Sequence, residues 1–116
     1  MKWSVEFHDE FYLEFLRLEL ETREEMLVKV KLLMEFGPQL GRPYVDTLID
    51  SIYPNMKELR FKIGKDIWRV AFAFDPLRSA ILLTAGNKQG KDQKLFYNNL
   101  IRKADQRFTD HLKSIN

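Results

Sequence analysis

Residues 57–88 constrain the fold more than any other part of the chain, because they contain three alternating segments separated by short turns. KELRFKI and DIWRVAFAF flank a turn at Gly64, and SAILLTAGNK follows DPLR after a second turn. A period of two is typical of strands that bury one face, and short turns join neighbouring antiparallel strands. The sequence therefore predicts a three-stranded antiparallel meander.

Strand and helix patterns precede the meander. KWSVEF, residues 2–7, alternates like a half-buried strand, and the apolar residues that follow two acids in residues 9–18 recur at helical spacing. TREE, residues 22–25, has the form of a capping box, in which the Thr22 and Glu25 side chains accept hydrogen bonds from the first free amides of a helix. These patterns predict a hairpin of two helices, the second beginning at Thr22 and ending at Gly37.

The remaining segments complete the predicted fold. Residues 38–55 contain three of the four prolines and no sustained period, which indicates a connecting segment. From Gln93 onward apolar residues recur at helical spacing, which predicts a C-terminal helix. We expect a single domain over residues 1–116 of the α+β class, with a small twisted, mainly antiparallel sheet and helices packed on one face.

Charge is distributed unevenly along the chain. Residues 1–56 hold 6 Lys and Arg against 11 Asp and Glu, a net charge of −5, whereas residues 57–103 hold 11 against 4, a net charge of +7. A basic half favours a polyanionic partner such as nucleic acid, although a solvated face is the simpler alternative. No apolar run approaches the roughly 20 residues of a membrane span, and cysteine is absent, so we expect a cytoplasmic protein without membrane contact.

Two arginines occupy strand positions where apolar residues would be easier to place. Strand alternation puts Arg60 and Arg69 on the face opposite the apolar residues, and Ala71 and Ala73 beside Arg69 predict open space there. The expected result is a shallow basic cleft that suits a phosphodiester, because Arg offers forked donors to phosphate oxygens. The alternative is a cross-strand ion pair between Arg69 and Glu58.

Histidine offers little basis for a metal site. His8 and His111 are the only histidines, they lie far apart in the sequence, and no cysteine or paired acidic motif accompanies them. His111 falls in a late turn of the predicted final helix, where it can interact with the helix dipole. We therefore expect neither a metal nor another cofactor.

Five segments of the chain resemble one known family in order and spacing: RPYVDTL, KELRF, WRVAFAFDPLRSAILL, GNK and LIRKADQRFTDHL. The family is the RelE/ParE superfamily of toxins from type II toxin–antitoxin modules, in particular its phage-derived, HigB-like branch. The resemblance implies a RelE-like fold and a metal-independent endoribonuclease that cleaves mRNA on the ribosome and inhibits translation. It also implies a helix-turn-helix antitoxin as partner, with operator DNA bound only through the complex of the two.

The resemblance also implies roles for single residues. Arg69 matches the toxin arginine that contacts the scissile phosphate, Arg60 matches a second basic position, and Lys88 falls near the leaving group. Lys57, Lys62 and Lys91 are predicted RNA contacts.

Two positions depart from the family pattern. Glu58 replaces a strand lysine of RelE, and it either activates the ribose 2′-hydroxyl or holds Arg69. Tyr97 lies farther from the glycine than the RelE tyrosine does, and it either stacks on a base or packs in the core. A ParE-like gyrase poison and a non-catalytic RNA- or antitoxin-binding domain are the alternative functions.

Overall fold

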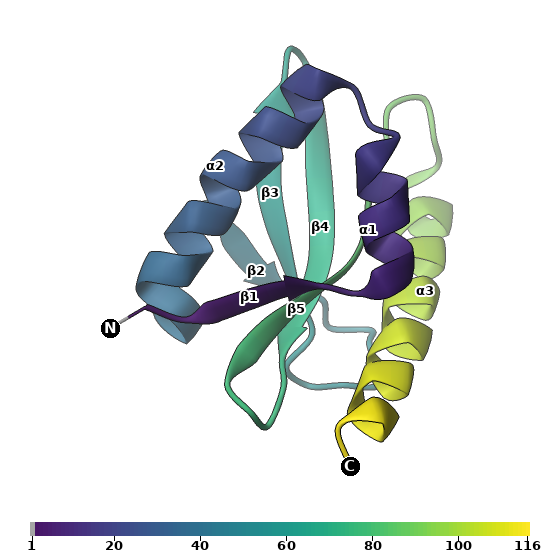
Figure 1. Cartoon of the computed structure of the whole chain (residues 1–116). Coiled ribbons are helices and arrows are strands. Elements are labelled where there is room, and N and C mark those ends of the chain that lie inside the picture. The colour runs from purple at the N-terminus through teal and green to yellow at the C-terminus, as the bar shows by residue number, and fades with distance from the viewer. Residues whose placement is uncertain (1) are drawn as a thin grey trace.

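The computed structural model describes residues 2–116 and consists of one five-stranded sheet with helices on both sides (Figure 1). The sheet order is β1-β5-β4-β3-β2. The elements are β1 (Ser4–Phe7), α1 (Asp9–Leu16), α2 (Leu20–Phe36), the 3-10 helix η1 (Gly37–Gln39), β2 (Val45–Thr47), β3 (Lys57–Ile63), β4 (Asp66–Phe74), β5 (Ser79–Asn87) and α3 (Gln93–Ser114).

The predicted meander is confirmed. β3 and β4 pair antiparallel, as do β4 and β5, and the bounds of all three strands agree closely with the alternating segments. β1 lies parallel to β5, so the sheet is mainly but not entirely antiparallel. The α+β class with a mainly antiparallel sheet, which the sequence predicts, is therefore confirmed.

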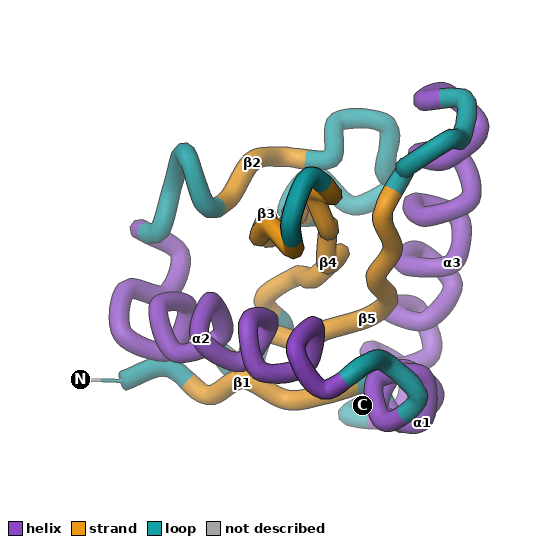
Figure 2. The backbone as a smooth tube through the Cα atoms, turned by 90° about the horizontal axis from the view of Figure 1, so that it is seen from above, coloured by secondary structure: helices purple, strands orange, loops and turns teal. Residues whose placement is uncertain are grey.

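The prediction that all helices cover one face of the sheet is wrong. Figure 2 shows α2 and α3 on opposite sides of the sheet, and each side has its own core. α1 and α2 pack on the face formed by Leu59, Phe61, Val70 and Phe72. α3 packs on the other face, which contains Ala71, Ala73, Ile81 and Leu83. Small alanines let a helix approach the strands closely, so they mark a second core rather than an open surface.

Local capping in the N-terminal half also differs from the sequence-based prediction. α2 begins at Leu20, and Thr22 is a buried residue inside the helix instead of its N-cap. Thr22, Met26, Val30 and Leu33 form the buried stripe of α2, so Thr22 packs inward, and the helix begins two residues before the predicted start. The N-cap of α1 is His8, whose Nδ1 accepts a hydrogen bond from the Glu10 amide at 3.1 Å.

The predicted connecting segment contains a strand that has no detectable period. β2 is three residues long and pairs antiparallel with β3, placing Val45 opposite Leu59 and Asp46 opposite Glu58. Three residues are too few for alternation to be recognised, because the pattern becomes distinctive only over four to eight. This edge strand brings Asp46 beside the arginine face.

Gly37 is expected to be essential for stability, because it closes α2 in a conformation that side chains disfavour. Its φ and ψ are 56° and −138°, and a Cβ built there would lie 2.3 Å from Trp3 Nε1. We expect Gly37→Ala to lower the free energy of unfolding by about 2–4 kcal/mol, through backbone strain and the clash with the indole.

Chemical denaturation of the purified protein measures this effect. Gly41→Ala is the matched control, because no heavy atom lies within 4 Å of the added Cβ and its φ is not in the positive region. Equal stability of the two variants would contradict the proposed role of Gly37.

Candidate active site

The register of β3 and β4 places Arg60 directly opposite Arg69. The sequence-based prediction that the two arginines share a face is therefore confirmed. Like charges directly opposite one another on a sheet repel, and the carboxylate of Glu58 compensates both. Arg60 Nη2 donates to Glu58 Oε2 at 2.8 Å, and Arg69 Nε forms an ion pair with Glu58 Oε1 at 3.5 Å. The cross-strand ion pair considered as the alternative is thus present.

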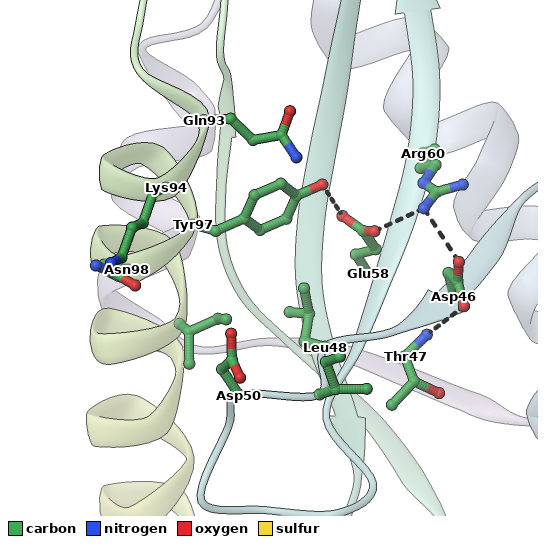
Figure 3. Close-up of a pocket in the computed structure, with 12 residues that line it drawn as sticks. Asp46, Thr47, Leu48, Asp50, Glu58, Arg60, Gln93, Lys94, Tyr97 and Asn98 are labelled. Atoms are coloured by element: carbon green, nitrogen blue, oxygen red, sulfur yellow. Dashed lines mark hydrogen bonds and ion pairs between the residues drawn. The ribbon is translucent and has the colours of Figure 1, made fainter.

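Tyr97 reaches the same carboxylate from α3 (Figure 3). Its hydroxyl donates to Glu58 Oε1 at 3.0 Å, and its ring centroid lies 5.5 Å from the Arg69 guanidinium carbon. Burial raises the pKa of Tyr97 above its ordinary value of 10.0, and the charge of Glu58 raises it further. Tyr97 therefore remains protonated at neutral pH and acts as a hydrogen-bond donor.

Arg60 has a second carboxylate partner, which the sequence did not reveal. Arg60 Nη2 lies 3.2 Å from Asp46 Oδ2, and Arg42 reaches the same oxygen at 3.2 Å. The pKa of Asp46 is lowered, first by the hydrogen bond from the Thr47 amide and then by these two arginines. Burial opposes the charge of Arg60, yet the hydrogen bond and the charge of Glu58 leave its pKa raised.

An open cavity of about 550 Å³ adjoins this network between β2, β3 and α3. Figure 3 shows Glu58, Arg60, Asp46 and Tyr97 directed toward one another at its wall. The remaining lining residues are Thr47, Leu48, Ile49, Asp50, Gln93, Lys94, Asn98 and Ile101. The cavity thus combines a buried carboxylate, a hydroxyl donor and an arginine that a ligand can reach.

Arg69 and Lys88 line a neighbouring cavity of about 290 Å³. Lys88 Nζ donates to Gln93 Oε1 at 2.9 Å, and Gln93 lines the larger cavity, so Lys88 connects the two cavities. Four predicted site residues, Glu58, Arg60, Arg69 and Tyr97, therefore form one network, with Lys88 next to it.

The prediction of open space beside the alanines is wrong. Ala71 and Ala73 are completely buried beneath α3, and Arg69 and Glu58 are only 7% and 3% exposed. The carboxylates of Glu58 and Asp46 also reduce the positive charge of the site. The cleft is consequently a compensated network at the edge of a second core, not a shallow basic surface.

Three of the predicted RNA contacts have neighbours outside the hydrogen-bond network, although Lys62 shares a cavity with Arg60. Lys57 donates to Thr47 Oγ1 at 3.1 Å, and by strand alternation it belongs to the opposite face of β3 from Glu58. Lys62 lines a cavity beside α2, and Lys91 Nζ lies 5.9 Å from the centre of the Phe96 ring. Their roles in RNA binding remain predictions.

The two histidines have structural contacts. His8 caps α1, and His111 Nε2 lies 2.7 Å from Asp75 Oδ2 in the turn between β4 and β5. Within residues 2–116, no three His, Cys, Asp or Glu side chains are placed to hold a metal ion. No helix in the same described range is long and apolar enough to cross a membrane.

The fold places the chain among the RelE-like α+β proteins. A double mutant of the E. coli toxin RelE in the free state superimposes with a TM-score of 0.56 at 15% identity, over 89% of this chain and 97% of RelE. A second structure of isolated E. coli RelE gives a TM-score of 0.51 at 13% identity, over 86% and 97% of the two chains. At these identities the likeness concerns the fold alone.

Sequence comparison gives the family. The chain belongs to the phage-derived protein Gp49-like family (DUF891), whose model matches residues 13–109. Two Mycobacterium tuberculosis (strain ATCC 25618 / H37Rv) proteins whose names class them as toxins are each 46% identical to it. HigB2 aligns over 82% of this chain and 47% of its own length, and HigB3 over 86% and 85%. The chain thus spans about half the length of HigB2.

Proposed function

We propose that this chain is the toxin of a type II toxin–antitoxin module and that it inhibits translation by cleaving mRNA on the ribosome. The observation that carries the proposal is the convergence of Arg60, Arg69 and Tyr97 on the Glu58 carboxylate, next to an open cavity of about 550 Å³. The names of HigB2 and HigB3 support the toxin part of this proposal. Cleavage of mRNA also requires a cytoplasmic protein.

In the proposed reaction, Glu58 takes the proton of a ribose 2′-hydroxyl, because a carboxylate can accept a proton whereas an arginine cannot. The 2′-oxygen attacks the adjacent phosphorus, a new O2′–P bond forms, and the P–O5′ bond breaks. The products are a 2′,3′-cyclic phosphate and a 5′-hydroxyl. Arg60 and Arg69 stabilise the additional charge on the phosphoryl oxygens, and Tyr97 orients the Glu58 carboxylate through its hydrogen bond.

Lys88 is the proposed donor to the leaving group. In-line displacement places the incoming 2′-oxygen and the leaving 5′-oxygen on opposite sides of phosphorus. Tyr97 is hydrogen-bonded to the proposed base, so it lies on the side of the incoming oxygen. Lys88 shares the neighbouring cavity with Arg69, so its ammonium is the proposed proton donor to the 5′-oxygen on the opposite side.

The proposed partner is a helix-turn-helix antitoxin, and operator DNA would be bound only by the complex of the two proteins. The names of HigB2 and HigB3 support an antitoxin, since a toxin of such a module is neutralised by one. Co-expression with the adjacent gene should restore growth and yield a complex on purification.

A second candidate function is a non-catalytic domain that binds RNA or an antitoxin. One observation favours it: in the free protein Glu58 is already hydrogen-bonded to Arg60 and Tyr97 and paired with the charge of Arg69, which reduces the positive charge available to a phosphate. For catalysis, a phosphate must either displace the Glu58 carboxylate from these side chains or bind to them beside it.

Induced expression should stop protein synthesis before DNA synthesis. Cleavage of ribosome-bound mRNA removes the template for translation directly, whereas a ParE-like gyrase poison blocks replication first. Pulse labelling with an amino acid and with thymidine after induction measures the order of the two effects, and an empty vector is the control. An earlier fall in thymidine incorporation would identify a gyrase poison instead, and no fall in either would favour the non-catalytic domain.

A further inference from the structure

The smaller cavity beside the network is more basic than the larger one. It lies between the turn that joins β3 to β4 and the loop that joins β5 to α3, and it is lined by Lys65, Asp66, Ile67, Arg69, Lys88 and Gln89. Three of these six residues are cations and one is an acid. The larger cavity has more acidic than basic residues, since three carboxylates line it together with one arginine and one lysine.

The single acid of the smaller cavity is engaged by a neutral group. When the Gln89 side-chain amide is oriented to donate, its nitrogen lies 3.2 Å from both carboxylate oxygens of Asp66. This contact joins the two loops, and within residues 2–116 it leaves Lys65 and Lys88 without a carboxylate partner, whereas Arg69 is paired with Glu58. Lys65 is exposed and forms no ion pair with any residue between positions 2 and 116.

Arg69 has unused donor capacity between the two cavities. Arg69 Nη1 donates to the Ile67 carbonyl at 3.1 Å, while Arg69 Nε is buried and lacks a hydrogen-bond partner, since Glu58 is only within ion-pair distance. A guanidinium has five N–H donors, and a buried donor left unpaired is costly. An anion held beside Arg69 would therefore gain donors that the free protein does not use.

We propose that the cavity of Lys65, Arg69 and Lys88 binds a second phosphate of the RNA strand, the one that follows the leaving nucleotide. This assignment rests on the proposed function. Because Lys88 is the proposed donor to the leaving 5′-oxygen and lines this cavity, the strand downstream of the cut passes over it. Lysine contacts to phosphate supply affinity without reading the base, so the subsite sets how long a strand must be rather than which sequence is bound.

Binding of non-cleavable RNA tests the subsite. The probes are a 2′-O-methyl pentanucleotide and a 2′-O-methyl dinucleotide with a single phosphate, measured by fluorescence anisotropy at several salt concentrations. We expect Lys65→Gln to weaken pentanucleotide binding about 3- to 10-fold and to reduce the slope of log K against log salt by about 0.7, the value for one phosphate contact of a single strand. Dinucleotide binding should not change.

Lys31→Gln is the matched control, because Lys31 is an exposed lysine on α2. It should bind both probes like the wild type. Unchanged pentanucleotide affinity in Lys65→Gln, an equal loss in Lys31→Gln, or an equal loss for the dinucleotide would each overturn the subsite and leave the proposed function intact. A wild-type protein that binds neither probe and cleaves no RNA would overturn the proposed function itself, and the subsite with it.

Discussion

Arg69→Ala is expected to lower RNA cleavage by about 100-fold or more, the usual effect of removing a preorganised donor from a charged transition state. The structure explains why Arg69 is preorganised. Its guanidinium carbon lies 5.9 Å from the centre of the Phe96 ring and 5.5 Å from that of Tyr97, and Glu58 and the Ile67 carbonyl fix its direction.

The same substitution is expected to reduce stability as well. Arg69 is buried, and its removal leaves the buried Glu58 with two partners instead of three. We expect a loss of about 1–3 kcal/mol in the free energy of unfolding, the range for a buried polar group that loses a partner. Cleavage must therefore be compared per folded molecule, with thermal melting followed by circular dichroism.

Arg69→Lys separates charge from geometry. A lysine keeps the positive charge but cannot reproduce the forked donors, so activity should recover only in part. Cleavage of ribosome-bound mRNA by wild type and both variants measures the effect. Full activity of the folded alanine variant would show that Arg69 does not contact the phosphate.

Glu58→Gln is expected to lower cleavage by about 100-fold or more while leaving RNA binding intact or tighter. The amide cannot take the proton of the 2′-hydroxyl, and general-base catalysis typically contributes 100-fold or more. Loss of the negative charge also frees Arg60 and Arg69, which lie opposite one another across the strands, to attract phosphate. Cleavage should therefore fall, whereas the affinity for a 2′-O-methyl oligonucleotide should stay the same or rise.

Asp46→Asn provides the matched control for Glu58. Asp46 also accepts from Arg60, but it lies on the edge strand and is much more exposed than Glu58. We expect at most a few-fold decrease in cleavage, because exposed ion pairs contribute little. If Glu58→Gln cleaves as fast as wild type, Glu58 only holds the arginines, and the proton acceptor is a different group.

The periodicity of the sequence was sufficient to predict the meander and the faces of its strands. Side chains alternate along a strand regardless of what packs against it, so the spacing of Leu59, Arg60 and Phe61 already separated the core face from the arginine face. The same alternation placed Arg69 opposite the core residues of β4, and the register confirms that it meets Arg60. The C-terminal helix was recognisable for an equivalent reason, since its period of 3.6 is a local property.

Only the tertiary structure decided what covers the arginine face. The alanines of β4 are equally compatible with an open cleft and with a close-packed helix, and the choice depends on where α3 lies. The hydrogen bond between Tyr97 and Glu58 joins residues 39 positions apart, and the contact of Arg60 with Asp46 requires an edge strand too short to show a period. Such contacts depend on the packing of separate elements, which alternation within one segment does not encode.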